Sequence, residues 1–262
     1  ISTGFNDLDE ITAGLQNSEM VIIAARPSVG KTAFALNLVR NIAVDEKTPV
    51  LFCSLEQSRV EIAERLMCCQ AGVDSQKLRK GTMNAEDMER LISASGALRD
   101  AQLFIDDSPG QSMLRIAANA RRLKLRNDIK LVVIDYLQLI EPENRRDPRQ
   151  EQVAQISRRI KGLARELSIP VVALAQVNRS SEDRQDHRPR LSDLRESGSI
   201  EQDADTVMLL HRPERFEPGQ NDGLMYVIVG KQRNGPVGEV ELFFNKNIMR
   251  FENFAAGTPF DN

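Results

Sequence analysis

The stretch that decides the fold is residues 19–32, which read Glu-Met-Val-Ile-Ile-Ala-Ala-Arg-Pro-Ser-Val-Gly-Lys-Thr. Residues 20–24 are apolar and rich in β-branched side chains, which is typical of a strand buried on both faces. Pro27 and Gly30 interrupt this run, and residues 33–44 continue with apolar side chains at helical spacing. The stretch therefore predicts a buried strand, a turn of small residues and a helix.

A strand, a small-residue turn and a helix that opens with Lys-Thr form the phosphate-binding loop of P-loop NTPases. Backbone N–H groups of the turn and the positive end of the helix face the phosphates. Lys31 adds a charge near the β- and γ-phosphates, and the Thr32 hydroxyl is a ligand for Mg²⁺. The strict pattern has glycine five residues before Gly30, where this sequence has Ala25. The strand before and the helix after still favour nucleotide binding over an ordinary glycine turn.

The composition is that of an ordinary globular protein. Of its 262 residues, 41% are hydrophobic and 28% charged, enough for a substantial core. The sequence has no apolar run that approaches the length of a membrane span, and no signal peptide opens it. Because it starts at Ile1 on a patterned segment, we expect a piece of a longer protein.

The cysteine spacing, the small number of histidines and the net charge limit which kinds of site the chain can contain. The three cysteines lack metal-ligand spacing, which favours neutral thiols in a reducing cytoplasm over disulfides or zinc. Two histidines leave little material for a histidine-centred triad or metal cluster. The net charge of −3 means that any nucleic-acid site must be a local patch.

Strands and helices alternate along the next part of the chain. Apolar runs predict four more strands, at 49–55, 103–105, 130–135 and 169–175. Periodic segments predict helices from residue 58 and at 85–98, 112–126 and 150–167. This alternation predicts an α/β fold, in which helices flank a mostly parallel twisted sheet.

The pattern changes after residue 176. Residues 177–201 are polar with nearly no apolar periodicity, which predicts a long functional loop. Short strands without helices between them are then predicted, at 206–210, 224–229, 239–244 and 248–251. We expect these C-terminal strands to extend the sheet in antiparallel fashion.

Polar side chains follow three of the predicted strands. Ligands bind at the carboxyl ends of strands in an open parallel sheet, so these side chains are candidates for the nucleotide site. Asp135 is either a carboxylate that holds Mg²⁺ through water or an ordinary helix-cap or surface aspartate. The phosphate loop beside it favours the first role. Glu56 is either a general base or a first-turn glutamate favoured by the helix dipole. Gln176 is either a γ-phosphate sensor or a turn glutamine.

Two basic segments are candidates for contacts beyond the nucleotide. Lys231 and Arg233 share one strand face if the strand continues that far, and could reach a neighbour's nucleotide as an arginine finger. The alternative is a solvated basic turn. In residues 177–201 acids nearly cancel the arginines and aromatics are lacking, so phosphate contacts are the expected mode of nucleic-acid binding. Arg195 with the small residues after it suits such a contact.

Six segments resemble the motor domain of bacterial replicative DNA helicases of the DnaB type, and they occur in the right order over nearly the whole chain. They are Ala-Arg-Pro-Ser-Val-Gly-Lys-Thr (25–32), Ser-Leu-Glu (54–56), Val-Ile-Asp-Tyr-Leu-Gln-Leu-Ile (133–140), Ala-Gln-Val-Asn-Arg (175–179), Asp-Leu-Arg-Glu-Ser-Gly-Ser-Ile-Glu-Gln-Asp-Ala-Asp (193–205) and Lys-Gln-Arg-Asn-Gly-Pro (231–236). Asp-Tyr-Leu-Gln and Arg-Glu-Ser-Gly are far more specific than the phosphate loop. In this family alanine is often found at the position of Ala25.

The resemblance implies a single RecA-like P-loop motor domain over residues 1–262, assembled as a ring of six with ATP and Mg²⁺ between neighbouring subunits. It implies that phosphates and metal are held by Ser28, Gly30, Lys31, Thr32, Ala33 and Asp135. Glu56 would be the catalytic base, and Gln176 would couple nucleotide state to the adjacent loop. Arg65 and Gln232 would lie near a nucleotide, and Lys231 and Arg233 would act in the next subunit's site. The backbone of single-stranded DNA would contact Arg195, Glu196 and Gly198.

The resemblance also implies partners and a location. Single-stranded DNA would be the track, and primase and a helicase loader would bind through an N-terminal region or the full protein. The expected location is the replisome on the nucleoid in the cytoplasm, with no membrane. A strand-exchange recombinase shares the fold, but the specific motifs disfavour it. A nucleotide-switched scaffold is the other alternative, and an ATPase indifferent to single-stranded DNA would favour it.

Overall fold

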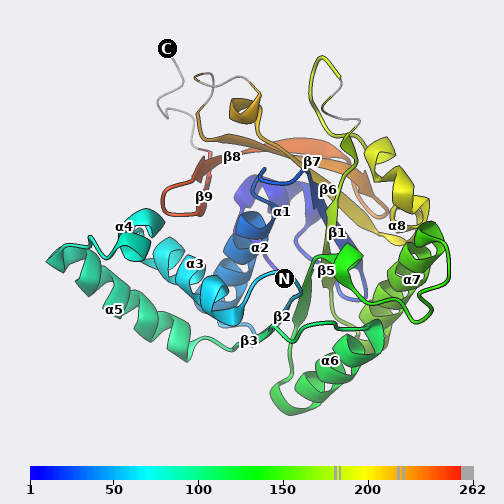
Figure 1. The fold of residues 1–262 in the computed structure, drawn as a ribbon, viewed down its shortest axis with the longest axis horizontal. Coiled ribbons are helices and arrows are strands. Elements are labelled where there is room, and N and C mark those ends of the chain that lie inside the picture. Colours follow the sequence, from blue (N-terminus) through cyan, green and yellow to red (C-terminus); the bar gives the residue numbers. More distant parts are fainter. Residues whose placement is uncertain (180–181, 183, 217–218, 220–221, 255–262) are drawn as a thin grey trace.

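One mixed sheet organises the computed structural model, which describes residues 1–254 except 180–181, 183, 217–218 and 220–221. Within this described part, nine strands follow the order β3-β2-β4-β5-β1-β6-β7-β8-β9 (Figure 1). The six strands from β3 to β6 in this order run parallel to one another, and β7, β8 and β9 are each antiparallel to the strands they pair with. This confirms the predicted α/β fold with antiparallel C-terminal strands.

The parallel strands form the centre of the sheet. They are β1 (Met20–Ala25), β2 (Val50–Ser54), β3 (Leu103–Asp106), β4 (Leu131–Asp135), β5 (Val171–Gln176) and β6 (Thr206–His211). Every residue of β1, β2, β4 and β6 is buried, as continuous apolar runs require of strands covered on both faces. β1 pairs with β5 on one side and β6 on the other, so the phosphate loop leaves from mid-sheet.

The antiparallel strands are β7 (Leu224–Gln232), β8 (Gly238–Asn245) and β9 (Arg250–Asn253). Buried residues tend to alternate with more exposed ones along β7 and β8, as expected where one face of a sheet packs on the core. Because β7 pairs with both β6 and β8, it lies inside the sheet.

Helices cover both faces of the sheet (Figure 1). The α-helices are α1 (Asn6–Thr12), α2 (Lys31–Arg40), α3 (Arg59–Ala71), α4 (Ser75–Lys80), α5 (Ala85–Asp100), α6 (Met113–Asn127), α7 (Arg149–Leu167) and α8 (Gly198–Asp203). One buried cluster packs α1, α2 and α3 on one face, and a second packs α6, α7 and α8 on the other. Within the described residues, each helix is too short or too polar to cross a bilayer.

The prediction of a loop over residues 177–201 is wrong in its second half. Leu191–Ser197 form a 3-10 helix that leads into α8. Leu194 and Ile200 are buried against the α7 face of the sheet and anchor these turns. Their polar neighbours bond to one another, as when Arg184 Nη1 donates to Asp193 Oδ1 at 2.9 Å. Two anchors are too few to produce a helical period in the sequence.

Two further helices were not predicted. In α1, Leu8 and Thr12 are buried, and Phe5 just before the helix stacks on Phe34 of α2 with ring centroids 5.4 Å apart. α4 has no buried residue, so its sequence carries no apolar period. Asp74 instead begins α4 as an N-cap that accepts from the Gln76 N–H at 2.7 Å.

Candidate nucleotide-binding site

The phosphate loop has the backbone that the sequence requires. β1 ends at Ala25, and α2 begins at Lys31, directly after Gly30. Gly30 has a φ of 121°, a conformation that glycine adopts and side-chain-bearing residues rarely do. The first N–H groups of α2 have no partner within the helix, and they lie beside the loop as an anion-binding terminus.

The Gly30→Ala variant is expected to lower the free energy of unfolding by about 1–3 kcal/mol, because a Cβ is strained at this φ. Space is not the cause, since a Cβ here would meet its nearest neighbour at 3.6 Å. Gly162→Ala in α7 is the matched control, because a Cβ there meets nothing within 4 Å. We expect it to raise stability by about 0.5–1 kcal/mol. Urea unfolding measures both, and equal shifts would contradict the assignment.

Thr32 and Asp135 meet below the loop. Thr32 Oγ1 donates a hydrogen bond to Asp135 Oδ2 at 2.7 Å. Asp135 is 1% exposed, and its Oδ1 has no partner among the described residues. Burial raises the pKa of this carboxyl, and the Lys31 charge and the Thr32 hydrogen bond oppose the rise. A buried carboxylate oxygen that lacks a partner, next to a hydroxyl, fits a hard cation such as Mg²⁺.

Lys31 lies within the same charged cluster. Its Nζ is 4.1 Å from the ring centroid of Tyr136. Burial lowers the pKa of Lys31, and the charges of Asp135 and Glu56 oppose this. The described residues hold no group of three or more His, Cys, Asp or Glu that could bind a metal. A cation beside Asp135 would therefore need further oxygens from a nucleotide and water.

A cavity of about 560 Å³ opens above this cluster, and its size suits a nucleotide. It brings together most residues predicted for the site, namely Ser28, Gly30, Lys31, Thr32, Ala33, Glu56, Arg65 and Gln176. Glu56 is exposed just after β2, in position to face a ligand. Arg65 belongs to α3. Its pKa is lowered mainly by burial and secondly by the positive charge of the nearby Arg79.

Sequence reasoning missed the far wall of this cavity. Arg212, Phe244, Lys246 and Met249 line it from the antiparallel side of the sheet. Arg212 Nη2 donates to the Ser28 carbonyl at 3.3 Å, and its guanidinium lies 5.9 Å from the Phe244 ring centroid. These residues are far from the loop in sequence and carry no local motif. The order β1-β6-β7-β8 is what brings them to the loop.

The phosphate loop is bonded directly to the segment after β5. Arg26 Nη1 donates to the Val177 carbonyl at 2.9 Å, and its Nε donates to Glu182 Oε1 at 3.0 Å. Val177 N–H in turn donates to the Ala25 carbonyl at 3.2 Å. The Gln138 side chain bonds both backbone groups of Gln176, at 3.2 and 3.3 Å. A movement of the phosphate loop would therefore be transmitted through these hydrogen bonds to the segment that follows β5.

Lys231, Gln232 and Arg233 lie away from this chain's own nucleotide cavity, at the end of β7. Lys231 Nζ donates to the Ala204 carbonyl at 2.7 Å and to the Glu201 carbonyl. Arg233 Nη2 donates to the Gln202 carbonyl. The two cations thus bind carbonyls at the end of α8 and just after it. Because β7 ends at Gln232, the strand reaches Lys231 but not Arg233. The buried Gln232 Oε1 has no partner among the described residues.

Three predicted DNA contacts fall where only the backbone is described. The side chains at Arg195 and Glu196, and the surroundings of Gly198, lie outside what the structure describes, so the role of these residues stays a prediction. The backbone there passes from the Leu191–Ser197 helix into α8. The predicted DNA contacts therefore lie at the start of α8, and Lys231 and Arg233 bind carbonyls at its other end.

Comparisons with known proteins agree with this geometry. A family model described as the DnaB-like helicase C terminal domain matches residues 1–253. The chain is 48% identical over 255 residues to the replicative DNA helicase DnaB of Geobacillus stearothermophilus, covering 97% of this chain and 56% of that protein. It is 46% identical over 260 residues to the DnaB of Haemophilus influenzae, covering 97% and 55%. The chain thus spans about half the length of the curated relatives it matches.

Two solved structures are similar over almost the whole chain. One is described as an ATPase domain, with a TM-score of 0.94, 41% identity, and coverage of 97% of this chain and 91% of that one. The other is described as the structure of a DnaB-like replicative helicase and its interactions with primase. It has the same TM-score and identity and covers 97% of this chain and 62% of that one.

Proposed function

The chain belongs to the DnaB-like helicase C-terminal domain family, and from this we propose that residues 1–262 are the ATP-hydrolysing motor domain of a replicative DNA helicase. The observation that carries the proposal is the cavity that the phosphate loop and Glu56 line, together with the hydrogen bond from Thr32 in its wall to the buried Asp135. The bonds from Arg26 to the segment after β5 add a path from the nucleotide to that segment.

In this proposal the residues of the cavity divide the work of hydrolysis. The loop N–H groups and Lys31 bind the phosphates, while Glu56 accepts the proton of the attacking water. Thr32 and Asp135 would hold Mg²⁺, which neutralises charge on the phosphate oxygens when it is bound. Arg65 and Arg212, both partly buried in the cavity wall, add positive charge near the nucleotide.

The motion would start at the phosphate loop and end on the DNA. Gln176 would sense the nucleotide state, because it lines the cavity and begins the segment that Arg26 bonds. Arg195, Glu196 and Gly198 would then shift along the backbone of single-stranded DNA. Contacts to sugar and phosphate suit a motor, because they do not depend on the base sequence.

We also propose that the working form is a ring of six on the nucleoid. Lys231 and Arg233 do not line their own cavity, and pairing through β6 places the end of β7 at the opposite end of β1 from the phosphate loop. They would therefore complete the site of the next subunit. Primase and a helicase loader would be partners of the full protein. The first of these has support from a similar structure that is described with primase.

The test is whether oligo-dT stimulates ATP hydrolysis by the purified protein. A motor couples the two, so we expect hydrolysis to rise with oligo-dT and the particle mass in light scattering to grow with a non-hydrolysable ATP analogue. Weak hydrolysis that is indifferent to oligo-dT would favour the nucleotide-switched scaffold instead. Filaments without closed rings would favour the recombinase.

The Arg195→Ala variant is expected to weaken binding to single-stranded DNA by a similar factor for every base sequence. Removing one phosphate contact should also reduce the slope of log affinity against log salt by about 1. Fluorescence anisotropy with dye-labelled oligo-dT at several salt concentrations measures both. Arg126→Ala, at the exposed end of α6, is the control with the same charge change. An unchanged salt slope for Arg195→Ala would reject the assignment.

A further inference from the structure

A second cavity, of about 790 Å³, lies along strand β3 and shares no lining residue with the nucleotide cavity. Leu103, Phe104, Ile105 and Asp106 line it in succession. Successive residues of a strand point to opposite faces, so a space lined by four in a row reaches the edge of that strand. β3 ends the sheet, and that edge pairs with no strand in the described residues.

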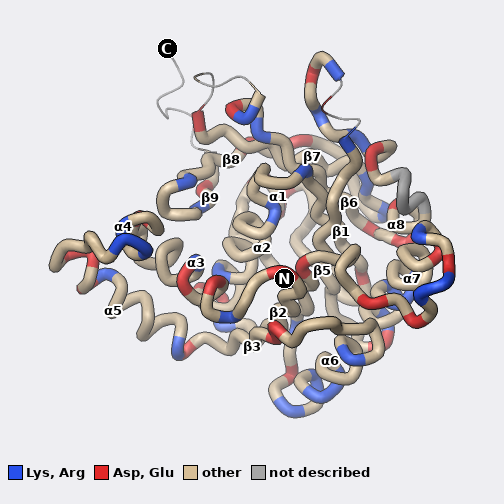
Figure 2. Tube along the Cα trace, viewed as in Figure 1, with Lys and Arg blue, Asp and Glu red and all other residues tan. Residues whose placement is uncertain are grey.

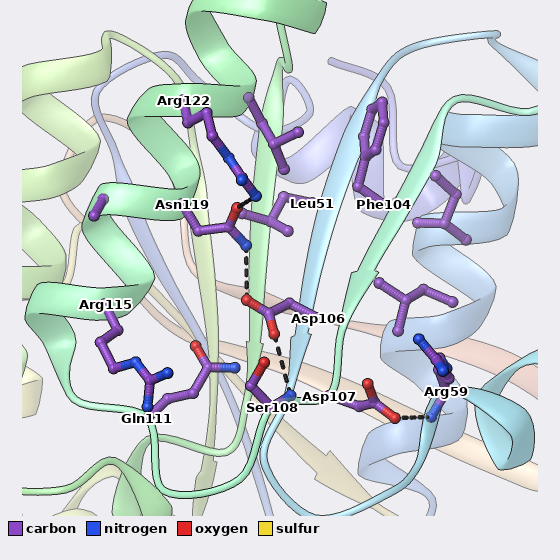
Figure 3. Close-up of a pocket in the computed structure, with 14 residues that line it drawn as sticks. Leu51, Arg59, Phe104, Asp106, Asp107, Ser108, Gln111, Arg115, Asn119 and Arg122 are labelled. Carbon is purple, nitrogen blue, oxygen red and sulfur yellow. Dashed lines mark hydrogen bonds between the residues drawn. The ribbon is translucent and has the colours of Figure 1, made fainter.

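One face of α6 forms the opposite wall of this β3 cavity. Arg115, Asn119 and Arg122 line it at the helical spacing of three and four. Figure 3 shows these three side chains on one side and Arg59, at the start of α3, across from them. Figure 2 shows that Lys and Arg are frequent along α6.

In the β3 cavity the carboxylates have hydrogen-bond partners, whereas the arginine side chains have no carboxylate partner within the part of the chain that the structure describes. Asp106 Oδ2 accepts from Asn119 Nδ2 at 2.7 Å, its Oδ1 accepts from the Ser108 N–H at 3.1 Å, and Asp107 Oδ2 accepts from the Arg59 N–H at 2.8 Å. By contrast, no ion pair to a described carboxylate is made by the side chains of Arg59, Arg115 and Arg122. Positive charge is therefore left for a ligand.

A buried donor in the same wall also lacks a partner. Gln111 is 1% exposed, and its Nε2 has no hydrogen-bond partner among the described residues. Figure 3 shows its amide nitrogen turned towards Ser108 and Asp106, inside the cavity. A buried N–H without a partner is costly, so an acceptor on a ligand would be favoured here.

We propose that the β3 cavity binds an extended acidic segment of a partner protein. The segment adds to the edge of β3 as a further strand, because this edge offers a row of N–H and C=O groups. Its carboxylates meet Arg59, Arg115 and Arg122, and a carbonyl accepts from Gln111. A nucleic acid fits less well, because its backbone has no alternating N–H and C=O groups that could pair with the edge of β3.

The probe for this site is a fluorescein-labelled peptide of alternating valine and glutamate, an acidic sequence that favours the extended conformation. We expect it to bind the whole chain and to slow hydrogen exchange of the β3 amides, because they gain partners. The variant with Arg59→Ala, Arg115→Ala and Arg122→Ala should bind about tenfold more weakly or worse. Arg126→Ala on the same helix, outside the cavity, should bind like the unaltered protein. Urea unfolding checks that each variant is folded.

Three results would overturn the proposal. The first is no binding, or equal binding of a peptide with glutamine in place of glutamate. The second is binding without protection of β3, which would mean a surface ion pair only. The third is protection of β3 that rises with protein concentration alone, which would assign the edge to a second copy of this chain.

Discussion

Replacing Glu56 with glutamine is expected to lower ATP turnover by about 10²- to 10⁴-fold while ATP still binds. Glu56 lies in the nucleotide cavity, and its charge acts on both Lys31 and Asp135. Glutamine keeps the size and most hydrogen bonds of the side chain but cannot take a proton from water. Steady-state hydrolysis with oligo-dT measures turnover, and a fluorescent ATP analogue measures affinity.

Glu46→Gln is the matched control for this prediction. Glu46 precedes β2 and Glu56 follows it, so the same change is made at opposite ends of one strand. We expect Glu46→Gln to hydrolyse ATP at the normal rate. Turnover by Glu56→Gln within a few-fold of normal would remove Glu56 from the role of base.

Arg233→Ala is expected to lower ATP turnover by about 10³- to 10⁵-fold, which is the range for loss of an arginine finger. Loss of its bond to the Gln202 carbonyl of α8 could lower turnover by a second route. Mixing subunits separates the two. Lys31→Ala subunits keep Arg233, so in a mixed ring they would complete the sites of Arg233→Ala neighbours if the site is shared between subunits. We expect two inactive variants to regain hydrolysis when they are mixed.

The control is a mixture of Lys31→Ala with Glu56→Gln. Both defects lie in the cavity of one chain, so neither subunit can supply what the other lacks. This mixture should stay inactive. If the Lys31→Ala and Arg233→Ala mixture also stays inactive under conditions where rings form, the site is not shared between subunits.

How far the sequence predicts the structure depends on how local each feature is. The phosphate loop and Asp135 were predictable because an apolar strand precedes each of them and places the polar group at the sheet edge. Arg212 and Phe244 were not, because pairing between distant strands brings them to the loop. The helical turns around Leu194 were missed because their two buried anchors, Leu194 and Ile200, are too few to give a helical period in the sequence.

The two cations at the end of β7 have a thermodynamic consequence. Lys231 and Arg233 hold carbonyls at the end of α8, and the same groups cannot at that moment bind a neighbour's phosphates. If they serve the neighbour, each nucleotide that captures them competes with α8 for the same two charges. Linkage is reciprocal, so if DNA bound at α8 weakens ATP binding in the neighbouring site, ATP bound there weakens DNA binding by the same free energy. A strand of DNA bound at the start of α8 would then change the affinity of the neighbouring subunit's site for ATP.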